Sequence, residues 1–398
     1  MSVRNTFPQQ RPTLNLDFAN SKTLDPRITF TRTSTATYVD EDGLIKSVDA
    51  DVARFDHDPV TGECLGLLVE EQRSNLLTYS DQLDEQSNWV DSGTSWSANT
   101  IISPDGTQNA DDPGFVSEKW GFYDDTNSSW ISGYPQNYPF TVTSEWVRHS
   151  ATITTPSGCT TLRFYPLRSG NDTSYIFQRV GVSTSTTYTA SAYYKLADDG
   201  TTVIAWGAQL ETGAFPTSYI PRPDTSTATR NPDSVSMTGD NFSDWYNPSE
   251  GTLLCVLNIS RDLTDLNTGS WTLDNGSFAR GLGMAHTINN PIRLFIRDSE
   301  NQKTANVSNV TLDEVKICSQ ILLNTNGVNE PNLVCVDGIF TPDTPNYNIS
   351  DEVSISRLVI GQNNIAGSPV DNYLNGTISK LTYYPTRLSN NQLQNLTK

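Results

Sequence analysis

The pattern of apolar and polar positions along the chain is typical of β-strands. Thr13–Phe18 alternates polar and apolar side chains, which is the period of a strand rather than a helix. Ile28–Tyr38 is rich in threonine and aromatic residues, which suit a half-exposed pleated surface. Asp40–Gly43 and Asp58–Gly62 have the composition of tight turns, and a short buried strand is expected over Leu65–Val69.

Further short strands are expected at intervals of roughly ten residues through the rest of the chain. They cover Trp146–Ile153, Thr161–Pro166, Ser174–Val182, Thr187–Tyr194, Thr202–Trp206, Thr252–Ile259, Gly281–Ala285, Ile292–Arg297, Leu333–Phe340, Val353–Ile360 and Thr377–Tyr384. Strands at this spacing favour β-sandwiches over βαβ units. One helix is expected, at the C-terminus, where Ser389 and Gln392 have the spacing of a capping box. The sequence therefore predicts an all-β fold with a short C-terminal helix.

Two segments have the composition of linkers. Ser80–Ser87 precedes a tryptophan-rich region, and Pro221–Pro232 holds three prolines, three threonines and no large apolar side chain. We therefore predict three domains, with boundaries at 1–80, 81–224 and 225–398.

The charge of the chain narrows the choice of partner. Its 398 residues include 26 Lys and Arg against 45 Asp and Glu, a formal charge of −19. Phosphate groups are bound by clustered cations, so this balance disfavours nucleic acid and anionic membranes as partners. No apolar run is long enough to cross a bilayer, and the first ten residues lack the pattern of a signal peptide. The five cysteines are odd in number and widely spaced, which disfavours a disulfide framework.

Motifs of catalysis and metal binding are not found in the sequence. The three histidines lie far apart, and no nucleophile elbow, zinc-protease or phosphate-loop motif occurs. Asp56-His57-Asp58 is interpreted as a polar turn, with a metal site as the alternative. A bound cation near Asp40 and Asp42 is a second alternative, although the calcium-loop spacing is missing. We expect no catalytic residue, no metal and no cofactor.

An aromatic segment in the middle of the chain is the strongest candidate for binding. Flat rings pack against the apolar faces of sugars, and nearby carboxylates and amides bind the hydroxyls. The alternative is that about half of these rings belong to a sandwich core. Asparagines and an aspartate in the last domain could also bind a ligand, or simply form turns. The candidate glycan-binding residues are Trp120, Tyr123, Asp125, Trp130, Tyr134, Tyr138, Asn363, Asn364, Asp371 and Asn372.

Two blocks near the N-terminus resemble a region of bacteriophage virion proteins. The first is TRTSTATYVDEDGLI, over residues 31–45. The second is RFDHDPVTGECLGLLVEEQRSNLL, over residues 54–77. The proteins that share this region are tail fibres, tail spikes and other appendages. The resemblance, which covers roughly residues 13–78, implies a block for virion attachment or assembly.

Two later segments resemble sugar-binding modules. WGAQLETGAFPTSYIP, over residues 206–221, is similar to the closing strand of a carbohydrate-binding jelly roll. RLVIG from Arg357 and LNGTISKLTYYPTRLS from Leu374 resemble the end of a laminin-G/concanavalin A-like sandwich. These resemblances imply a jelly-roll module followed by a lectin-like module.

Together these features favour a structural and adhesive subunit of a phage particle, such as a tail fibre, on the exterior of the virion and assembled in the host cytoplasm. Its partners would be other virion proteins, a host surface glycan, and copies of itself, most often as a trimer. One alternative is a capsid decoration or head-fibre protein without specific receptor binding. The other is a tail-spike enzyme that cuts polysaccharide, for which the last domain shows no Glu-x-Asp-x-x-Glu pattern.

Overall fold

The computed structural model describes most of the chain in two compact units. The described residues are 8, 10–96, 101–115, 117, 119–131, 138–139, 142–198, 200–258, 268–276, 281–287, 290–297, 302–307, 314–322, 333–340, 355–363 and 373–398. Unit 1 comprises residues 1–42, 48–71 and 231–398, and unit 2 comprises residues 43–47 and 72–230.

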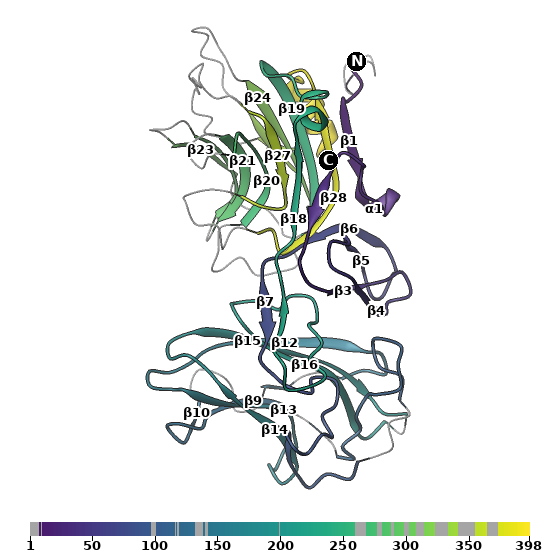
Figure 1. The fold of residues 1–398 in the computed structure, drawn as a ribbon, viewed down its shortest axis with the longest axis vertical. Coiled ribbons are helices and arrows are strands. Elements are labelled where there is room, and N and C mark those ends of the chain that lie inside the picture. The colour runs from purple at the N-terminus through teal and green to yellow at the C-terminus, as the bar shows by residue number, and fades with distance from the viewer. Residues whose placement is uncertain are drawn as a thin grey trace. The chain divides into compact units, whose positions relative to one another are not determined.

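Unit 1 is a sandwich of two antiparallel sheets, seen as two layers in Figure 1. The eight-stranded sheet contains β1 (Leu14–Asp17), β5 (Phe55–His57), β6 (Cys64–Val69), β19 (Glu250–Asn258), β24 (Glu314–Leu322), β25 (Val334–Val336), β26 (Ile339–Phe340) and β28 (Gly376–Tyr384). The seven-stranded sheet contains β2 (Thr29–Thr31), β18 (Ser234–Thr238), β20 (Thr268–Asp274), β21 (Gly281–Thr287), β22 (Asn290–Arg297), β23 (Gln302–Val307) and β27 (Arg357–Ile360). Leu253 and Leu381 of the first sheet share one core with Trp271 and Leu358 of the second.

In the described part of unit 1, three helices accompany the sheets. The short helices α1 (Phe18–Ser21) and α2 (Asp240–Ser243) are single turns that the sequence analysis does not predict. The predicted C-terminal helix is confirmed as α3 (Asn390–Leu396), with a capping box between Ser389 and Gln392. Among the described residues, no helix has the length and apolarity needed to span a membrane.

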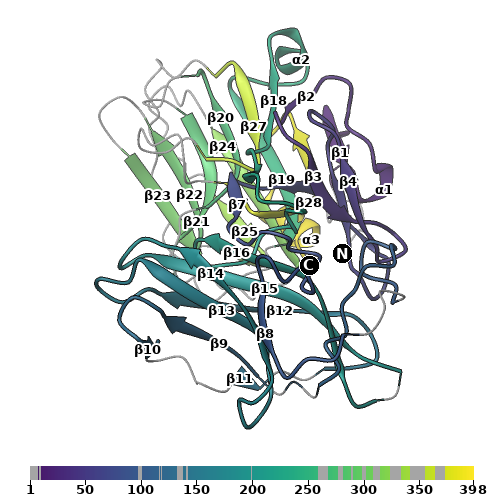
Figure 2. The ribbon, with the colours of Figure 1, turned by 60° about the horizontal axis from the view of Figure 1, so that its bottom comes forward.

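Unit 2 is a second sandwich, with six strands in one sheet and three in the other. The larger sheet contains β8 (Val90–Ser92), β9 (Lys119–Asp124), β10 (Ser129–Trp130), β11 (Tyr138–Pro139), β13 (Thr161–Arg168) and β14 (Tyr175–Gly181). The smaller contains β12 (Val147–Thr154), β15 (Thr187–Leu196) and β16 (Val203–Thr212). Leu162 and Phe164 of the larger sheet share a core with Ala192 and Leu210 of the smaller. In Figure 2, β10, β9, β13 and β14 lie side by side.

The predicted all-β fold of several sandwiches with a short C-terminal helix is confirmed. The expected strand over Ile28–Tyr38 divides into β2 and β3 (Ala36–Val39), and β4 (Ile45–Val48) follows the predicted turn, where Gly43 has a φ of 76°. Several strands have no counterpart among those expected from the sequence pattern, including the long strands β9, β20 and β24.

The two compact units follow other boundaries than the three predicted domains. Within the predicted domain 1–80, strand β1 pairs with β28, β2 with β18, and β6 with β28. This segment therefore supplies strands to both sheets of the sandwich built by residues 231–398. The long segment of unit 2, residues 72–230, begins and ends with two paired strands, β7 (Arg73–Asn75) and β17 (Ala228–Arg230). The predicted linker Ser80–Ser87 includes Leu83, which is buried in the core of unit 2.

Candidate functional site

The aromatic segment predicted to bind sugars supplies side chains to both faces of the larger sheet of unit 2. Trp120 and Phe122 on β9 point into the core, where Trp120 lies edge-on to Phe164 and Tyr194 at centroid distances of 6.1 and 6.3 Å. Trp120 is 0% exposed, and a buried ring cannot offer its face to a sugar. The prediction that Trp120 binds a ligand is therefore corrected, and its role is in the core.

Tyr123 and Trp130 lie on the opposite face of the same sheet. They are directly paired across β9 and β10, which places both side chains on one side, and their ring centroids are 5.2 Å apart. Both are half-buried, as is Asp125 at the end of β9. The structure therefore brings three of the predicted residues together.

Side chains on β9, β13 and β14 alternate between the core and the outer side of the sheet. The outward side chains form a continuous surface around Tyr123, Asp125 and Trp130, and we call this surface the aromatic–arginine face. On each strand the residues between the core positions point outward. A bulge in β13 between Tyr165 and Arg168 keeps both of these side chains on the outer side. The outward side of these strands carries Tyr123, Trp130, Arg163, Tyr165, Arg168, Tyr175, Phe177 and Arg179, of which Tyr165, Arg168 and Phe177 are themselves buried.

One row of this face crosses four strands. Trp130 is opposite Tyr123, Tyr123 is opposite Arg163, and Arg163 is opposite Arg179. At the usual strand spacing the row is about 14 Å long. Because the row is carried by hydrogen-bonded strands, its order is fixed by the sheet.

The carboxylate of Asp125 lies between two arginines of the row. Arg163 donates to Oδ1 of Asp125, and Nε of Arg179 donates to Oδ2 over 2.8 Å. Burial raises the pKa of Asp125, but the hydrogen bonds from Arg163 and Arg179 outweigh it, and the net shift of the pKa is downward. Asp125 is thus an ionised group shared by two guanidinium groups.

Neighbouring side chains pack against the ring of Trp130. The guanidinium carbon of Arg168 lies 4.0 Å from the ring centroid of Trp130, a cation–π contact. A Cβ at Gly121 would lie 2.8 Å from Arg168 Nη1 and 3.1 Å from the Trp130 ring, so the absence of a side chain at Gly121 leaves room for both. Asp172 accepts a hydrogen bond from Arg168 over 2.8 Å and completes this support.

Of the other predicted site residues, the structure describes Asn363 and the backbone of Tyr138. Asn363 follows β27 in unit 1 and is 1% exposed, so it cannot meet a ligand at the surface; among the described residues its amide atoms have no hydrogen-bond partner. Tyr138 is in β11, where its backbone pairs with Trp120. The remaining predicted residues lie outside the described residues. They are Tyr134, Asn364, Asp371 and Asn372.

The acidic turns near the N-terminus make local hydrogen bonds. His57 Nδ1 lies 2.9 Å from the carbonyl oxygen of Val39, and Asp58 accepts hydrogen bonds from the backbone N–H groups of Val60 and Thr61. Asp40 accepts one from the N–H of Asp42 over 3.0 Å. Asp40 and Asp58 thus begin polar turns, whereas Asp56 and His57 lie in strand β5, so the interpretation of Asp56-His57-Asp58 as a turn is correct only for Asp58. In the described parts of the chain, no group of three His, Cys, Asp or Glu side chains is placed to hold a metal.

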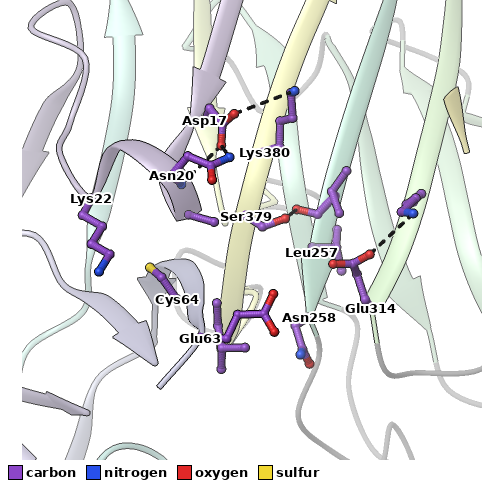
Figure 3. A pocket seen from close by; sticks show the side chains of 14 residues that line it. Asp17, Asn20, Lys22, Glu63, Cys64, Leu257, Asn258, Glu314, Ser379 and Lys380 are labelled. Carbon is purple, nitrogen blue, oxygen red and sulfur yellow. Dashed lines mark hydrogen bonds and ion pairs between the residues drawn. The ribbon is translucent and has the colours of Figure 1, made fainter. Parts of the chain in front are cut away.

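Unit 1 has a surface pocket of about 720 Å³ that the sequence analysis does not single out (Figure 3). Its charged lining is mixed, with Asp17 paired to Lys380 at 3.9 Å and Glu314 to Lys316 at 3.7 Å. Glu63 also lines it. These residues come from distant parts of the sequence, which is why no local motif marks the pocket.

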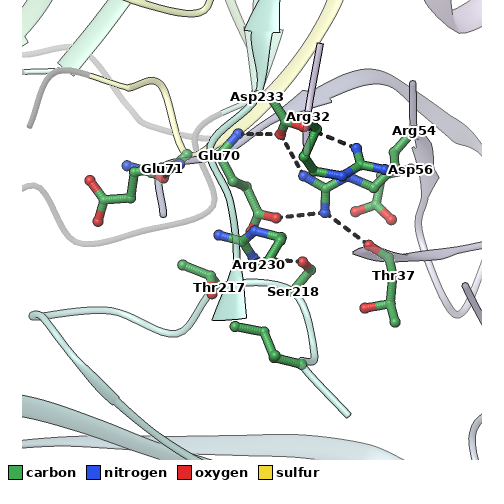
Figure 4. A network of polar contacts seen from close by, with 12 residues as sticks. Arg32, Thr37, Arg54, Asp56, Glu70, Glu71, Thr217, Ser218, Arg230 and Asp233 are labelled. Atoms are coloured by element: carbon green, nitrogen blue, oxygen red, sulfur yellow. Dashed lines mark hydrogen bonds and ion pairs between the residues drawn. The ribbon is translucent and has the colours of Figure 1, made fainter. Parts of the chain in front are cut away.

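Several residues of the N-terminal blocks 31–45 and 54–77 belong to a buried network of charged side chains (Figure 4). The guanidinium group of Arg54 donates to Glu70 Oε2 over 2.7 Å, to Asp233 Oδ2 over 2.6 Å and to the carbonyl oxygen of Thr37 over 2.9 Å. Arg32 donates to the other oxygen of Asp233 over 3.1 Å. Arg32, Thr37, Arg54 and Glu70 lie in the blocks 31–45 and 54–77, and their buried contacts stabilise the fold of unit 1.

No family model matches the sequence, and no curated protein matches it. Among solved structures, the chain is similar to the Ruminococcus gnavus IT-sialidase CBM40 bound to alpha2,3 sialyllactose, with 12% identity, 38% of this chain and 84% of the other covered, and a TM-score of 0.31. The leech intramolecular trans-sialidase in complex with 2,7-anhydro-Neu5Ac gives 13% identity, 41% and 26% coverage, and a TM-score of 0.33. The binding domain of botulinum neurotoxin serotype D/C gives 10% identity, 41% and 40% coverage, and a TM-score of 0.32. The assignment of the fold rests on the chain's own sheets and cores.

Proposed function

We propose that this chain is a structural and adhesive subunit of a bacteriophage particle that binds glycans on the host surface. The observation that carries the binding part is the row of half-buried aromatic rings and arginines on the aromatic–arginine face. Exposure of aromatic rings to water is unfavourable. Outward-facing rings on a sheet are therefore typical of binding surfaces. Tyr123 and Trp130 offer ring surface to a sugar, and Asp125 and Arg163 offer hydrogen bonds to hydroxyl groups.

The phage part of the proposal is supported by the sequence resemblance of residues 13–78. Under this proposal the subunit is a tail fibre or a similar appendage on the outside of the virion, a homotrimer joined to other virion proteins. It acts by binding and not by catalysis. The charged network around Arg54 supports a role of these residues in folding unit 1, so the contacts to other virion proteins would be made by its surface.

Adsorption of phage particles tests the proposal. The purified chain should compete with particles for candidate host bacteria and lower the rate of adsorption, whereas the Trp130→Ala variant should not. Antibodies against the chain should label the tail of the particle in electron micrographs. Labelling of the capsid without competition would favour a decoration protein, and absence from every particle would contradict the proposal.

A further inference from the structure

Cations gather on the aromatic–arginine face and beside it, although the chain as a whole carries a formal charge of −19. Lys119, which directly faces Arg168 across β9 and β13, adds a fourth cation to Arg163, Arg168 and Arg179. The carboxylates paired with these cations are those of Asp125 and Asp172. Each carboxylate is therefore shared by two cations, and these six side chains carry a net positive charge.

The pair of Lys119 and Arg168 and the pair of Arg163 and Arg179 differ in their exposure to solvent. The side chains of Lys119 and Arg168 are 6% and 4% exposed and are bound to Asp172, and Arg168 also packs against the ring of Trp130. The side chain of Arg179 is 48% exposed and that of Arg163 is 25% exposed. A ligand can therefore reach the second pair, next to Tyr123 in the row.

Arg163 and Arg179 retain the capacity to bind an anion. A guanidinium group has five N–H donors in a planar fork that matches a carboxylate. Arg179 uses Nε for Asp125 over 2.8 Å. The guanidinium carbon of Arg163 also lies over the Tyr123 ring, 5.1 Å from its centroid, so the positive charge is next to a ring that contacts the sugar in this proposal.

We infer that the glycan bound on this face is acidic, with a carboxylate-bearing sugar. This inference rests on the proposed glycan-binding function. The carboxylate pairs with Arg179 and Arg163, and the neighbouring sugar packs on Tyr123 and Trp130. Charge-assisted hydrogen bonds are among the strong polar contacts in proteins, so the acidic group decides which glycan is selected.

A glycan array with matched acidic and carboxyl-reduced members of the same backbones tests the inference. Wild-type protein should bind acidic members, and carboxyl reduction should weaken binding about tenfold or more. Arg179→Gln should cause a similar loss for acidic members only. Lys195→Gln is the matched control, because it removes one positive charge from β15 in the other sheet of unit 2 and should leave binding unchanged.

The outcomes separate the inference from the proposed function. Equal binding of acidic and carboxyl-reduced glycans, lost in Trp130→Ala, would overturn the acidic class and leave glycan binding in place. Binding to no glycan at all would overturn both. Since Arg179 is half-exposed, its substitution should leave the melting temperature unchanged, and a folded Arg179→Gln protein with undiminished binding to acidic glycans would also contradict the inference.

Discussion

The guanidinium group of Arg54 and the carboxylate of Asp233 form an ion pair of 2.6 Å, with both side chains fully buried, although 179 residues separate them in the chain. Asp233 also accepts hydrogen bonds from Arg32 and from the backbone N–H of Glu70. Asp233 thus contacts both buried arginines, compensates their charge together with Glu70, and joins three segments of unit 1. The stability of unit 1 should depend on it.

Asp233→Asn should lower the free energy of unfolding of unit 1 by about 3–5 kcal/mol, because removing one partner of a buried ion pair leaves an uncompensated charge. Urea unfolding followed by circular dichroism measures this. Glu41→Gln is the control, since Glu41 forms an exposed ion pair with Lys22 and its loss should leave the unfolding midpoint unchanged. Equal stability of Asp233→Asn and wild type would contradict the role of the network.

Deletion of residues 1–71 should prevent unit 1 from folding. The deleted segment supplies β1, β2, β5 and β6, which pair with strands of both sheets. Hydrogen–deuterium exchange should show loss of protection in β19 and β28, while β13 of unit 2 stays protected. Full protection of β19 in the shortened chain would mean that residues 1–71 are a separate domain.

Trp130→Ala should weaken glycan binding by about 1–3 kcal/mol and leave the melting temperature nearly unchanged, because the ring lies on the outer face. The matched control is Trp120→Ala on the neighbouring strand. Trp120 is buried in the core, so its truncation should lower stability by about 3–5 kcal/mol. A large fall in melting temperature for Trp130→Ala, comparable to that of Trp120→Ala, would contradict its assignment to a binding surface.

The stability of unit 2 should decrease as the pH rises from about 4 to 8. Burial raises the pKa of Asp111 to about 8, from an unfolded value near 4. In this range the folded state holds a proton that the unfolded state releases, so unfolding becomes easier by up to about 1.4 kcal/mol per pH unit. Asp111→Asn should remove this slope, because an amide does not titrate. The amide oxygen can still accept the hydrogen bond from the N–H of Leu83, so the variant should fold. Urea unfolding at several pH values measures this. An equal pH dependence of the unfolding free energy in wild type and Asp111→Asn would contradict the raised pKa of Asp111.

Many of the strands, but not all, could be predicted from the sequence because their signal is local. In β13 the apolar Leu162 and Phe164 alternate with Arg163 and Tyr165, and the predicted strand begins at the observed residue. Strand β9 was not predicted, since Trp120, Phe122 and Tyr123 are aromatic on both faces and give no contrast between inside and outside. Which ring is buried depends on the pairing of β9 with β13, about forty residues later in the chain.

The candidate site could be predicted only in part. Composition indicated Tyr123, Asp125 and Trp130, which lie within eight positions of one another. It could not indicate Arg163 and Arg179, because their shared contact with Asp125 forms across three strands. Alternation in the predicted strands Thr161–Pro166 and Ser174–Val182 already placed these arginines opposite the core, and this was the available signal. The ion pair of Arg54 and Asp233 has no such local signal.

The most direct test of the central claim is to mix the purified chain with bacterial surface polysaccharide and to measure binding and the release of reducing ends in the same samples. Wild-type protein should bind without releasing reducing ends, and Trp130→Ala should bind more weakly. Release of reducing ends by wild type would contradict the adhesive function and favour a polysaccharide-cutting enzyme. Undiminished binding by a folded Trp130→Ala protein would contradict the aromatic–arginine face as the binding site.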